Sequence, residues 1–303
     1  MTNYTATSRN VGSAVSEQIR PLQERELQIL KELKRVCEKN RLSYFLAFGT
    51  LLGAVRHGGF IPWDDDIDVC MSYPDYLALD KACKADLADG YFLQSAETDP
   101  ESRLTYKKLR LNASTFIHED YAGRDMHHGI AIDVYPLFHV AEGAFARKFQ
   151  IACAVLYLLL TVGEPPRHHG RMYKLAASIL LGLCGGKFRE HALKFCLKEM
   201  TKYEDRETGF RAMFFGNASY CRTVYPADLF ESATTMRFED EEFSAPCGYD
   251  AFLKQMYGDY WKLPPVEEQG VKLNHIVMLD CDRSYLDYKG ICYCKSGTGA
   301  CSV

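Results

Sequence analysis

The sequence lacks an excess of positive charge. Its 303 residues include 36 lysine and arginine residues against 40 aspartate and glutamate residues, so the formal net charge is −4 at pH 7. A protein that binds DNA or RNA needs a basic surface to neutralise the phosphates, so we exclude a long nucleic acid as a partner. Small phosphorylated substrates remain possible, because a few local cations can hold them.

The sequence also lacks an apolar run long enough to cross a bilayer. The longer of two apolar stretches, residues 149–163, would form a helix of about 22 Å, against about 30 Å for the hydrocarbon core. No apolar segment near residue 1 predicts a signal peptide. The twelve cysteines show no spacing typical of a disulfide framework. We therefore expect a cytoplasmic protein with reduced thiols.

What the sequence does have is a dense motif over residues 45–71, FLAFGTLLGAVRHGGFIPWDDDIDVCM. Its last acids alternate with apolar residues, as Asp66-Ile67-Asp68-Val69. Alternate side chains of a strand share a face, so Asp66 and Asp68 are predicted to point the same way. Two adjacent carboxylates repel each other, and a hard divalent cation such as Mg²⁺ or Mn²⁺ relieves that repulsion. We interpret both as metal ligands and catalytic residues.

A third acid occurs in the same alternating pattern. Asp133 lies between Ile132 and Val134 in the stretch GIAIDVYPLF. A lone D-x-D pair would be equally compatible with a solvated acidic turn. The repeated alternation favours a site, and we predict that Asp133 faces Asp66 and Asp68 from a neighbouring strand and completes the set of metal ligands and catalytic acids.

Candidate phosphate-binding groups lie just before the acids. Gly49 and Thr50 precede a short helix predicted over residues 51–57, whose exposed amides favour an anion. Arg56 and His57 end that helix. They either cap its C-terminus or contact a phosphate, and we favour the phosphate contact for Arg56.

A second basic cluster lies in the strand predicted over residues 106–111. Alternation places Lys108 and Arg110 on one face and Lys107 on the other. A solvated strand face and a phosphate-binding face explain this pattern equally well. We include Lys108 and Arg110 among the candidate substrate-binding residues.

These motifs resemble the LicD family, whose members are relatives of the fukutin-related protein. The segments GTLLGAVRHGGFIPWDDDIDV and GIAIDVYPL are similar to the family's nucleotidyltransferase-like pattern of a small-residue turn, a D-h-D-h strand and a later h-D-h strand, where h is apolar. Thr50 stands where that pattern usually has Ser or Gly. The resemblance is dense over residues 45–71, looser to 139, and returns in FEDEEFSAPCGYDAFLKQMYGDYWKLPP. It favours Lys108 as a phosphate contact.

The resemblance implies an α+β fold, with a nucleotidyltransferase-like mixed sheet, flanking helices and an inserted or appended helical section. We expect a catalytic core with an N-terminal helix over residues 1–140, a helical section over 141–219, and a C-terminal segment over 220–303 that packs back on the core. Hydrophobic periodicity and turn signals predict the elements. The expected helices are 16–39, 51–57, 72–87, 188–206 and 249–257, and the expected strands are 44–48, 91–94, 106–111, 115–118 and 130–135.

The resemblance further implies a metal-dependent phosphotransferase. Such an enzyme moves a substituted phosphate, for example phosphocholine, from a CDP-activated donor to a hydroxyl of a glycan or lipid-linked glycan precursor. Three alternatives remain. The same acids would serve a nucleotidyltransferase that releases pyrophosphate, a catalytically idle nucleotide-binding domain, or a glycosyltransferase that holds a nucleotide sugar.

Two further segments leave their roles open. The apolar runs 149–163 and 175–186 flank a turn with Arg167, His168, His169 and Arg171. They form either a buried helical hairpin or a face that lies on the inner surface of a membrane. The late cysteines Cys281, Cys292, Cys294 and Cys301 form either a zinc site or isolated thiols, and their narrow C-x-C spacing favours the latter.

Overall fold

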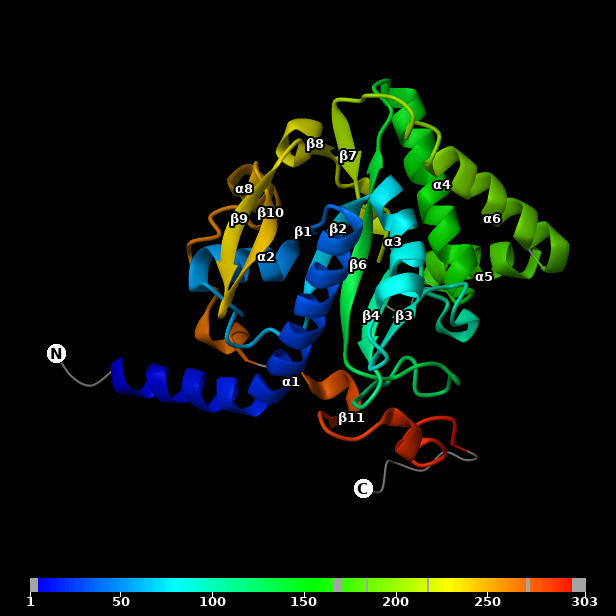
Figure 1. Cartoon of the computed structure of the whole chain (residues 1–303). Coiled ribbons are helices and arrows are strands. Elements are labelled where there is room, and N and C mark those ends of the chain that lie inside the picture. The colour runs from blue at the N-terminus through cyan, green and yellow to red at the C-terminus, as the bar shows by residue number, and fades with distance from the viewer. Residues whose placement is uncertain (1–4, 166–170, 184, 217, 271–272, 296–303) are drawn as a thin grey trace.

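The computed structural model describes residues 5–165, 171–183, 185–216, 218–270 and 273–295 (Figure 1). A curled mixed sheet lies at the centre, and helices cover it on both sides. This arrangement confirms the expected α+β class and is consistent with a nucleotidyltransferase-like fold. Helices and strands lie close to the ranges that the sequence predicts, with exceptions at the candidate site.

The central sheet has seven strands, five of them in one path. The path runs β1 (Phe45–Leu46), β2 (Asp68–Ser72), β6 (Ala131–His139), β4 (Lys107–Leu111) and β3 (Tyr91–Gln94). Strands β2 and β6 pair in parallel, and the other neighbours in the path pair antiparallel. The far half of β6 also pairs with β7 (Phe210–Ala212), which pairs with β8 (Tyr225–Pro226). Strand β6 is therefore the centre of the sheet.

The C-terminal third of the chain returns to the core in two places. Strands β9 (Ala233–Phe238) and β10 (Glu241–Pro246) form a hairpin, and α8 (Tyr249–Tyr257) follows it. Strand β11 (Ile276–Asp280) pairs antiparallel with β5 (Thr115–His118). Because β11 brings the late part of the chain beside β5, residues far apart in sequence line one cavity.

Two helices begin at places that matter for the site. Helix α2 (Phe48–His57) starts three residues before the range that the sequence predicts, so Gly49 and Thr50 lie in its first turn. Helix α3 (Tyr73–Asp86) starts where expected, and the Ser72 hydroxyl accepts a hydrogen bond from the Asp75 amide as its N-cap. The first strand of the acidic motif begins only at Asp68, so Asp66 precedes the strand instead of lying within it.

Helix α1 (Thr5–Asn40) is longer than the helix expected over residues 16–39, because it begins eleven residues earlier. Figure 1 shows it bent, with one part projecting and the other packed on the core. Pro21 lies inside this helix, and a proline there removes a backbone hydrogen bond and kinks the helix. The packed part buries Ile29, Leu30 and Leu33 completely.

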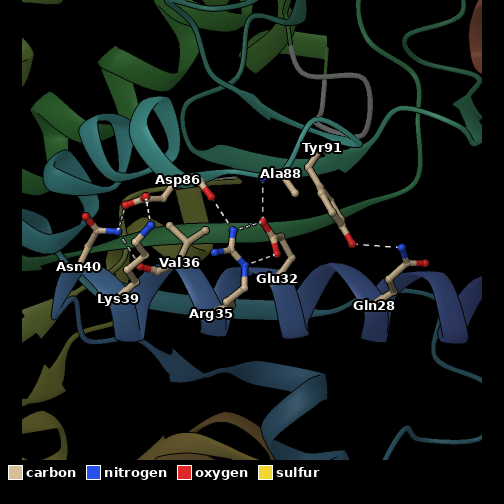
Figure 2. A network of polar contacts seen from close by, with 9 residues as sticks. All are labelled: Gln28, Glu32, Arg35, Val36, Lys39, Asn40, Asp86, Ala88 and Tyr91. Atoms are coloured by element: carbon tan, nitrogen blue, oxygen red, sulfur yellow. Dashed lines mark hydrogen bonds and ion pairs between the residues drawn. The ribbon is translucent and has the colours of Figure 1, made fainter.

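Polar contacts fix the packed part of α1 along one side (Figure 2). Glu32 accepts a hydrogen bond from the Ala88 amide at 2.9 Å and two from Arg35. Further contacts join Lys39 and Asn40 to Asp86, and Gln28 to Tyr91. The position of α1 relative to the sheet is thus set by both apolar burial and directional hydrogen bonds.

Three helices form a separate layer beside β6: α4 (Ala144–Val162), α5 (Arg171–Leu183) and α6 (Gly186–Met200). Within the described residues, α4 is the one helix long and apolar enough to cross a membrane by length and composition, and 28% of its most apolar window is buried. The sequence-based expectation of no such segment was wrong, because α4 begins five residues before the apolar run 149–163. The layer is therefore not the fully buried hairpin that we considered. Residues Arg167, His168 and His169 of the predicted basic turn lie outside the described residues, as does the side chain of Arg171.

Candidate functional site

The pairing of β2 with β6 places two of the predicted acids side by side. Asp68 and Asp133 are direct partners in the parallel register. The flanking Val69, Ile132 and Val134 are completely buried, as the alternation predicts. Asp68 is 7% exposed, and its Oδ1 atom has no hydrogen-bond partner among the described residues. A buried carboxylate without a partner is costly, so a bound cation would stabilise this position.

Asp66 reaches the same region from the loop before β2. It is exposed and, together with Asp133, lines a cavity of about 300 Å³. Asp68 does not line that cavity, so the structure separates the two acids that we expected to share a strand face. The proximity of the three acids shows in their electrostatics, because Asp66 and Asp133 both raise the pKa of Asp68.

Gly49 and Thr50 position the acids instead of presenting open phosphate contacts. The Thr50 hydroxyl, 2% exposed, accepts a hydrogen bond from the Asp68 amide at 2.8 Å. A Cβ atom at Gly49 would lie 2.6 Å from Asp64 Oδ2, so glycine lets the acidic loop approach the first turn of α2. The expected phosphate position at this helix start is thus next to the Asp64 carboxylate.

Arg56 and His57 lie away from the acidic cavity. Arg56 donates a hydrogen bond to the Tyr260 carbonyl at 2.8 Å, and burial lowers its pKa while Asp64 opposes that change. His57 is exposed and meets the edge of Trp63. Neither residue lines the cavity that contains Asp66 and Asp133, so the structure does not group them with the other candidate substrate contacts.

The basic cluster of β4 follows the predicted alternation. Lys108 and Arg110 line the acidic cavity, whereas Lys107 points to the other face and pairs with Asp80 at 2.7 Å. Lys108 Nζ lies 2.5 Å from Asp133 Oδ1. Arg110 donates hydrogen bonds to Gln94 and to the Gly129 carbonyl, and burial lowers its pKa to about 10. Lys108 is therefore the cation nearest the acids, and Arg110 also has a structural role.

The cavity has walls from five parts of the chain, and most of its lining residues were not among the candidates. α1 provides Glu26, and β11 follows a short helix that provides His275. The full lining is Glu26, Asp65, Asp66, Lys108, Arg110, Phe116, His118, Tyr121, Met126, His128, Ala131, Asp133 and His275. The cavity thus combines four acids, two permanent cations, three histidines and two aromatic rings.

Burial of the acids, followed by repulsion between them, dominates the electrostatics of the site. Burial, then Asp66 and Asp65, raise the pKa of Asp64 to about 8. Burial and Asp133 raise the pKa of Asp66 as well, although this side chain is exposed and water partly screens it. Both carboxylate oxygens of Asp133 have a partner, because Lys108 contacts one and the Tyr135 hydroxyl donates to the other at 3.0 Å. A cation would lower all of these shifts.

The oxygen atoms of the site fit a hard divalent cation. Within the described residues, one group of three acids has ligand atoms that all lie within 4.8 Å of one another: Asp64, Asp65 and Asp66. Asp66 is thus shared with the predicted ligand set, whereas Asp68 and Asp133 do not belong to this tighter group. Carboxylate oxygens, one of them buried without a partner at Asp68, are the donors that Mg²⁺ and Mn²⁺ prefer.

The late cysteines do not assemble a zinc site in the described part of the chain. Cys281 and Cys294 are free thiols, and Cys292 is disulfide-bonded, which departs from the expectation of reduced thiols throughout. Cys301 lies outside the described residues. Nine cysteines in the described part are free, most of them buried.

Sequence reasoning missed Glu26, Asp65, His118 and His275 for different reasons. Asp65 was visible in the acidic run, but the strand alternation that selected Asp66 and Asp68 excluded it. The strand begins only at Asp68, so this alternation does not apply to Asp65 and Asp66. Glu26 carried a signal, because an acid stood among the apolar positions of a helix stripe. His118 and His275 had none, since only the pairing of β5 with β11 brings them to a ring distance of 4.7 Å.

Comparisons with known proteins agree with this geometry. Residues 41–144 match the family model described as "LicD/FKTN/FKRP, nucleotidyltransferase domain". The chain is 28% identical over 261 residues to the lipopolysaccharide cholinephosphotransferase LicD of Haemophilus influenzae, covering 82% of this chain and 93% of that protein. An uncharacterized protein of Rickettsia prowazekii is 44% identical over a shorter stretch of 52 residues, which is 17% of this chain and 20% of that protein. Residues 41–144 therefore match a LicD-family nucleotidyltransferase domain, and the chain is similar to a LicD protein over most of its length.

Proposed function

We propose that this chain is a phosphotransferase that moves a substituted phosphate, such as phosphocholine, from a CDP-activated donor to a hydroxyl of a cell-surface glycan precursor. The supporting observation is the acidic cavity, which Asp66, Lys108 and Asp133 line. The buried Asp68 is the direct strand partner of Asp133. The similarity to a lipopolysaccharide cholinephosphotransferase over most of both chains supports the class of group transferred. The glycan acceptor, free or lipid-linked, and a cytoplasmic location are part of the same proposal.

Each residue has a defined task in this proposal. Asp66 and Asp68 would hold Mg²⁺ or Mn²⁺, with Asp64 and Asp65 close enough to contribute oxygen atoms. When bound, such an ion supplies positive charge to the donor phosphates. Lys108, now paired with Asp133, would contact the transferring phosphate and stabilise its developing charge. Asp133, once released by Lys108, would accept the proton of the acceptor hydroxyl.

Arg56, His57 and Arg110 have smaller parts in the proposal. Arg110 shapes the cavity wall through its hydrogen bonds to Gln94 and Gly129. Arg56 and His57 lie at the C-terminal end of α2 and do not line the cavity, although the charge of Arg56 interacts with that of Asp64. Gly49 and Thr50 set the position of Asp64 and Asp68.

The main alternative is a nucleotidyltransferase that transfers a nucleoside monophosphate and releases pyrophosphate. The same acids would hold its metal ions, and the aromatic rings of Phe116 and Tyr121 do not distinguish the two. The products do distinguish them. A phosphotransferase with a CDP donor releases CMP, whereas a nucleotidyltransferase with CTP releases pyrophosphate.

A donor screen tests the proposal. The purified chain is incubated with Mg²⁺ and CDP-choline, CDP-glycerol, CDP-ribitol or CTP, together with a glycan acceptor extract, and CMP and pyrophosphate are both measured. We expect CMP from one CDP donor, dependent on the acceptor, and none from the Asp66→Asn variant. Pyrophosphate from CTP would establish the alternative, and neither product under any condition would favour an idle nucleotide-binding domain.

A further inference from the structure

Glu26 on α1 is a buried acid with no visible partner. Its side chain is 2% exposed, and its Oε2 atom accepts no hydrogen bond from a described residue. It lies outside the family domain of residues 41–144, yet it lines the acidic cavity together with Asp65 and Asp66. An orphaned carboxylate oxygen in a cavity wall indicates a ligand that the side chain was selected to contact.

A second acid of the same helix shows what a satisfied carboxylate looks like here. Glu32 is also largely buried, at 8% exposed, but it accepts a hydrogen bond from the Ala88 amide and pairs with Arg35. Figure 2 shows these contacts on the side of α1 that faces α3 and β3. Glu26 has no comparable contact, although an apolar residue at its place would pack without any desolvation cost. Helix packing therefore does not explain Glu26.

The backbone of the acidic loop is tied to the helix one turn away from Glu26. Gln23 Nε2 donates a hydrogen bond to the Asp64 carbonyl at 3.0 Å and a longer one, at 3.4 Å, to the Ile61 carbonyl. Residues three apart share a helix face, so Gln23 and Glu26 project on the same side of α1. This contact holds the helix and the acidic loop at a fixed spacing, with Glu26 directed to the cavity that Asp65 and Asp66 line.

The charge of the cavity shows which class of ligand is missing. Four acids line it, Glu26, Asp65, Asp66 and Asp133, against two permanent cations. Lys108 is already paired with Asp133, and Arg110 is turned to Gln94 and the Gly129 carbonyl. His275 Nε2 lies 3.7 Å from Asp65 Oδ2 and adds positive charge only when it is protonated. Permanent positive charge is therefore short near Glu26, Asp65 and Asp66, and a donor with two phosphates would increase the deficit.

We infer that Glu26 is a ligand for a divalent cation in the acidic cavity, held together with Asp65 and Asp66. Glu26 is not in the group of acids whose oxygens lie within 4.8 Å of one another, so its side chain has to turn toward Asp65 and Asp66 when the ion binds. This ligand set combines α1 with the loop before β2, so the helix that precedes the family domain completes the metal site. The inference rests on the proposed function in one respect, the use of a hard divalent cation by these acids. It adds a residue that the family domain does not contain.

The test measures cation binding by the full chain, with Mn²⁺ as the probe and free Mn²⁺ followed by electron paramagnetic resonance. Glu26→Gln keeps the shape of the side chain and removes its charge. We expect it to weaken Mn²⁺ binding tenfold or more, and we expect Glu26→Asp to bind with intermediate affinity. The matched control is Glu24→Gln, because Glu24 lies on the same helix, is exposed and pairs only with Arg20 at 3.4 Å. Its affinity for Mn²⁺ should equal that of the wild type.

The outcomes separate this inference from the proposed function. Mn²⁺ affinity of Glu26→Gln within twofold of the wild type would overturn the inference, as would a wild type that binds no Mn²⁺. If Glu26→Gln keeps its Mn²⁺ affinity but raises the KM for CDP-choline and not for CDP-glycerol, Glu26 contacts a cationic headgroup and the inference is wrong. Loss of Mn²⁺ binding in a chain that releases no CMP from any donor would support the inference while the proposed function fails. As a folding control, the thermal unfolding midpoint of Glu26→Gln is measured in chelator and should be no lower than that of the wild type. If it is lower, the Mn²⁺ affinity of Glu26→Asp decides the test instead.

Discussion

Two cavities of this chain differ in volume and in the charge and polarity of the side chains that line them. The cavity beside β6 and β4 is about 300 Å³ in volume and lined by acids, cations and histidines. The groove between α4 and α5 is about 660 Å³ in volume and lined almost entirely by aliphatic side chains, with Lys148 and Arg222 as its charged members. One chain therefore has a site suited to charged small molecules and a separate surface suited to apolar partners.

The surroundings sharpen this contrast. The helical layer exposes large apolar side chains, with Phe145 86% exposed, Phe188 63% and Leu175 62%. Exposed apolar patches of this kind usually mark an interaction surface. The family domain ends at residue 144, where α4 begins, so the chemistry of the acidic cavity and the apolar surface lie in adjacent, separately recognisable parts of the sequence. We propose that the second part faces lipid, which would bring a lipid-linked acceptor near the first.

The largest effect should come from removing the charge of Asp68. We expect Asp68→Asn to reduce turnover on the order of 10³-fold or more, because a metal-binding carboxylate is lost. Its unfolding midpoint in chelator should equal or exceed that of the wild type, since Asp66 and Asp133 crowd a buried acid with an unpartnered oxygen. Scanning calorimetry and CMP release measure both quantities. A midpoint lowered by more than a few degrees would show that Asp68 is structural.

Lys108 should show the opposite balance of activity and stability. Lys108→Met removes the cation that contacts Asp133 at 2.5 Å and leaves the acids uncompensated. We expect turnover to fall on the order of 10²-fold and the unfolding midpoint in chelator to fall as well. Lys107→Met, on the opposite face and paired with Asp80, serves as the matched control. It should lose stability and keep the kcat measured for the wild type.

The helical layer should bind lipid independently of the acidic cavity. We expect the chain to float with vesicles that contain anionic lipid, and salt should weaken this binding because Lys148 and Arg222 contribute to it. Leu159→Glu, in the groove and only partly buried, should reduce flotation about tenfold without unfolding the chain. Asp68→Asn should float like the wild type. Concentration-dependent dimers in place of flotation would mean that the groove binds a second copy.

The smallest effect concerns pH. Burial and neighbouring acids raise the pKa of Asp64 to about 8, so the folded state retains a proton that the unfolded state has released. Unfolding free energy should therefore fall as pH rises from about 6.5 to 8.5, which we expect as a midpoint decrease of about 3–8 °C in chelator. Between about pH 4 and 6.5 the decrease should be shallower, because burial lowers the pKa of His127 to about 3 and of His128 to about 4, and these imidazoles oppose the buried carboxyl groups. Saturating Mg²⁺ should flatten the decrease above pH 6.5, and an unchanged slope would argue against a cation among these acids.

The sequence predicted much of this fold because its signals are local. Alternation in D-h-D-h and h-D-h located β2 and β6 and the pairing of Asp68 with Asp133. The same rule separated Lys108 and Arg110 from Lys107. Helix α8 ends at Tyr257, where Gly258 stops it as expected. These predictions depend on strand alternation, with a period of two residues, and on helical periodicity, with a period of three to four residues. Both patterns are set by residues that are close together in the sequence.

The errors come from contacts between distant segments. Asp66 was assigned to a strand, but pairing with β6 begins only at Asp68, so the acid lies in a loop. Thr50 was expected to face a substrate, and its hydroxyl instead binds the Asp68 amide 18 residues later. The α1 wall and the β11 wall of the cavity depend on packing across more than 30 residues. Contacts between distant segments produce no periodic pattern in the sequence, so they could not be predicted from it.

Strand β6 has a consequence for how the molecule comes apart. Its first half, with Ile132 and Val134, belongs to the core under the acidic site, and its second half, with Phe138, belongs to the core that the helical layer covers. Nine residues of one extended segment thus tie both cores together, and β2, β4 and β7 all depend on it. Neither half can melt without removing a strand from the other. We expect heat or denaturant to produce a single cooperative unfolding transition, even though the sequence analysis divided the chain into three sections.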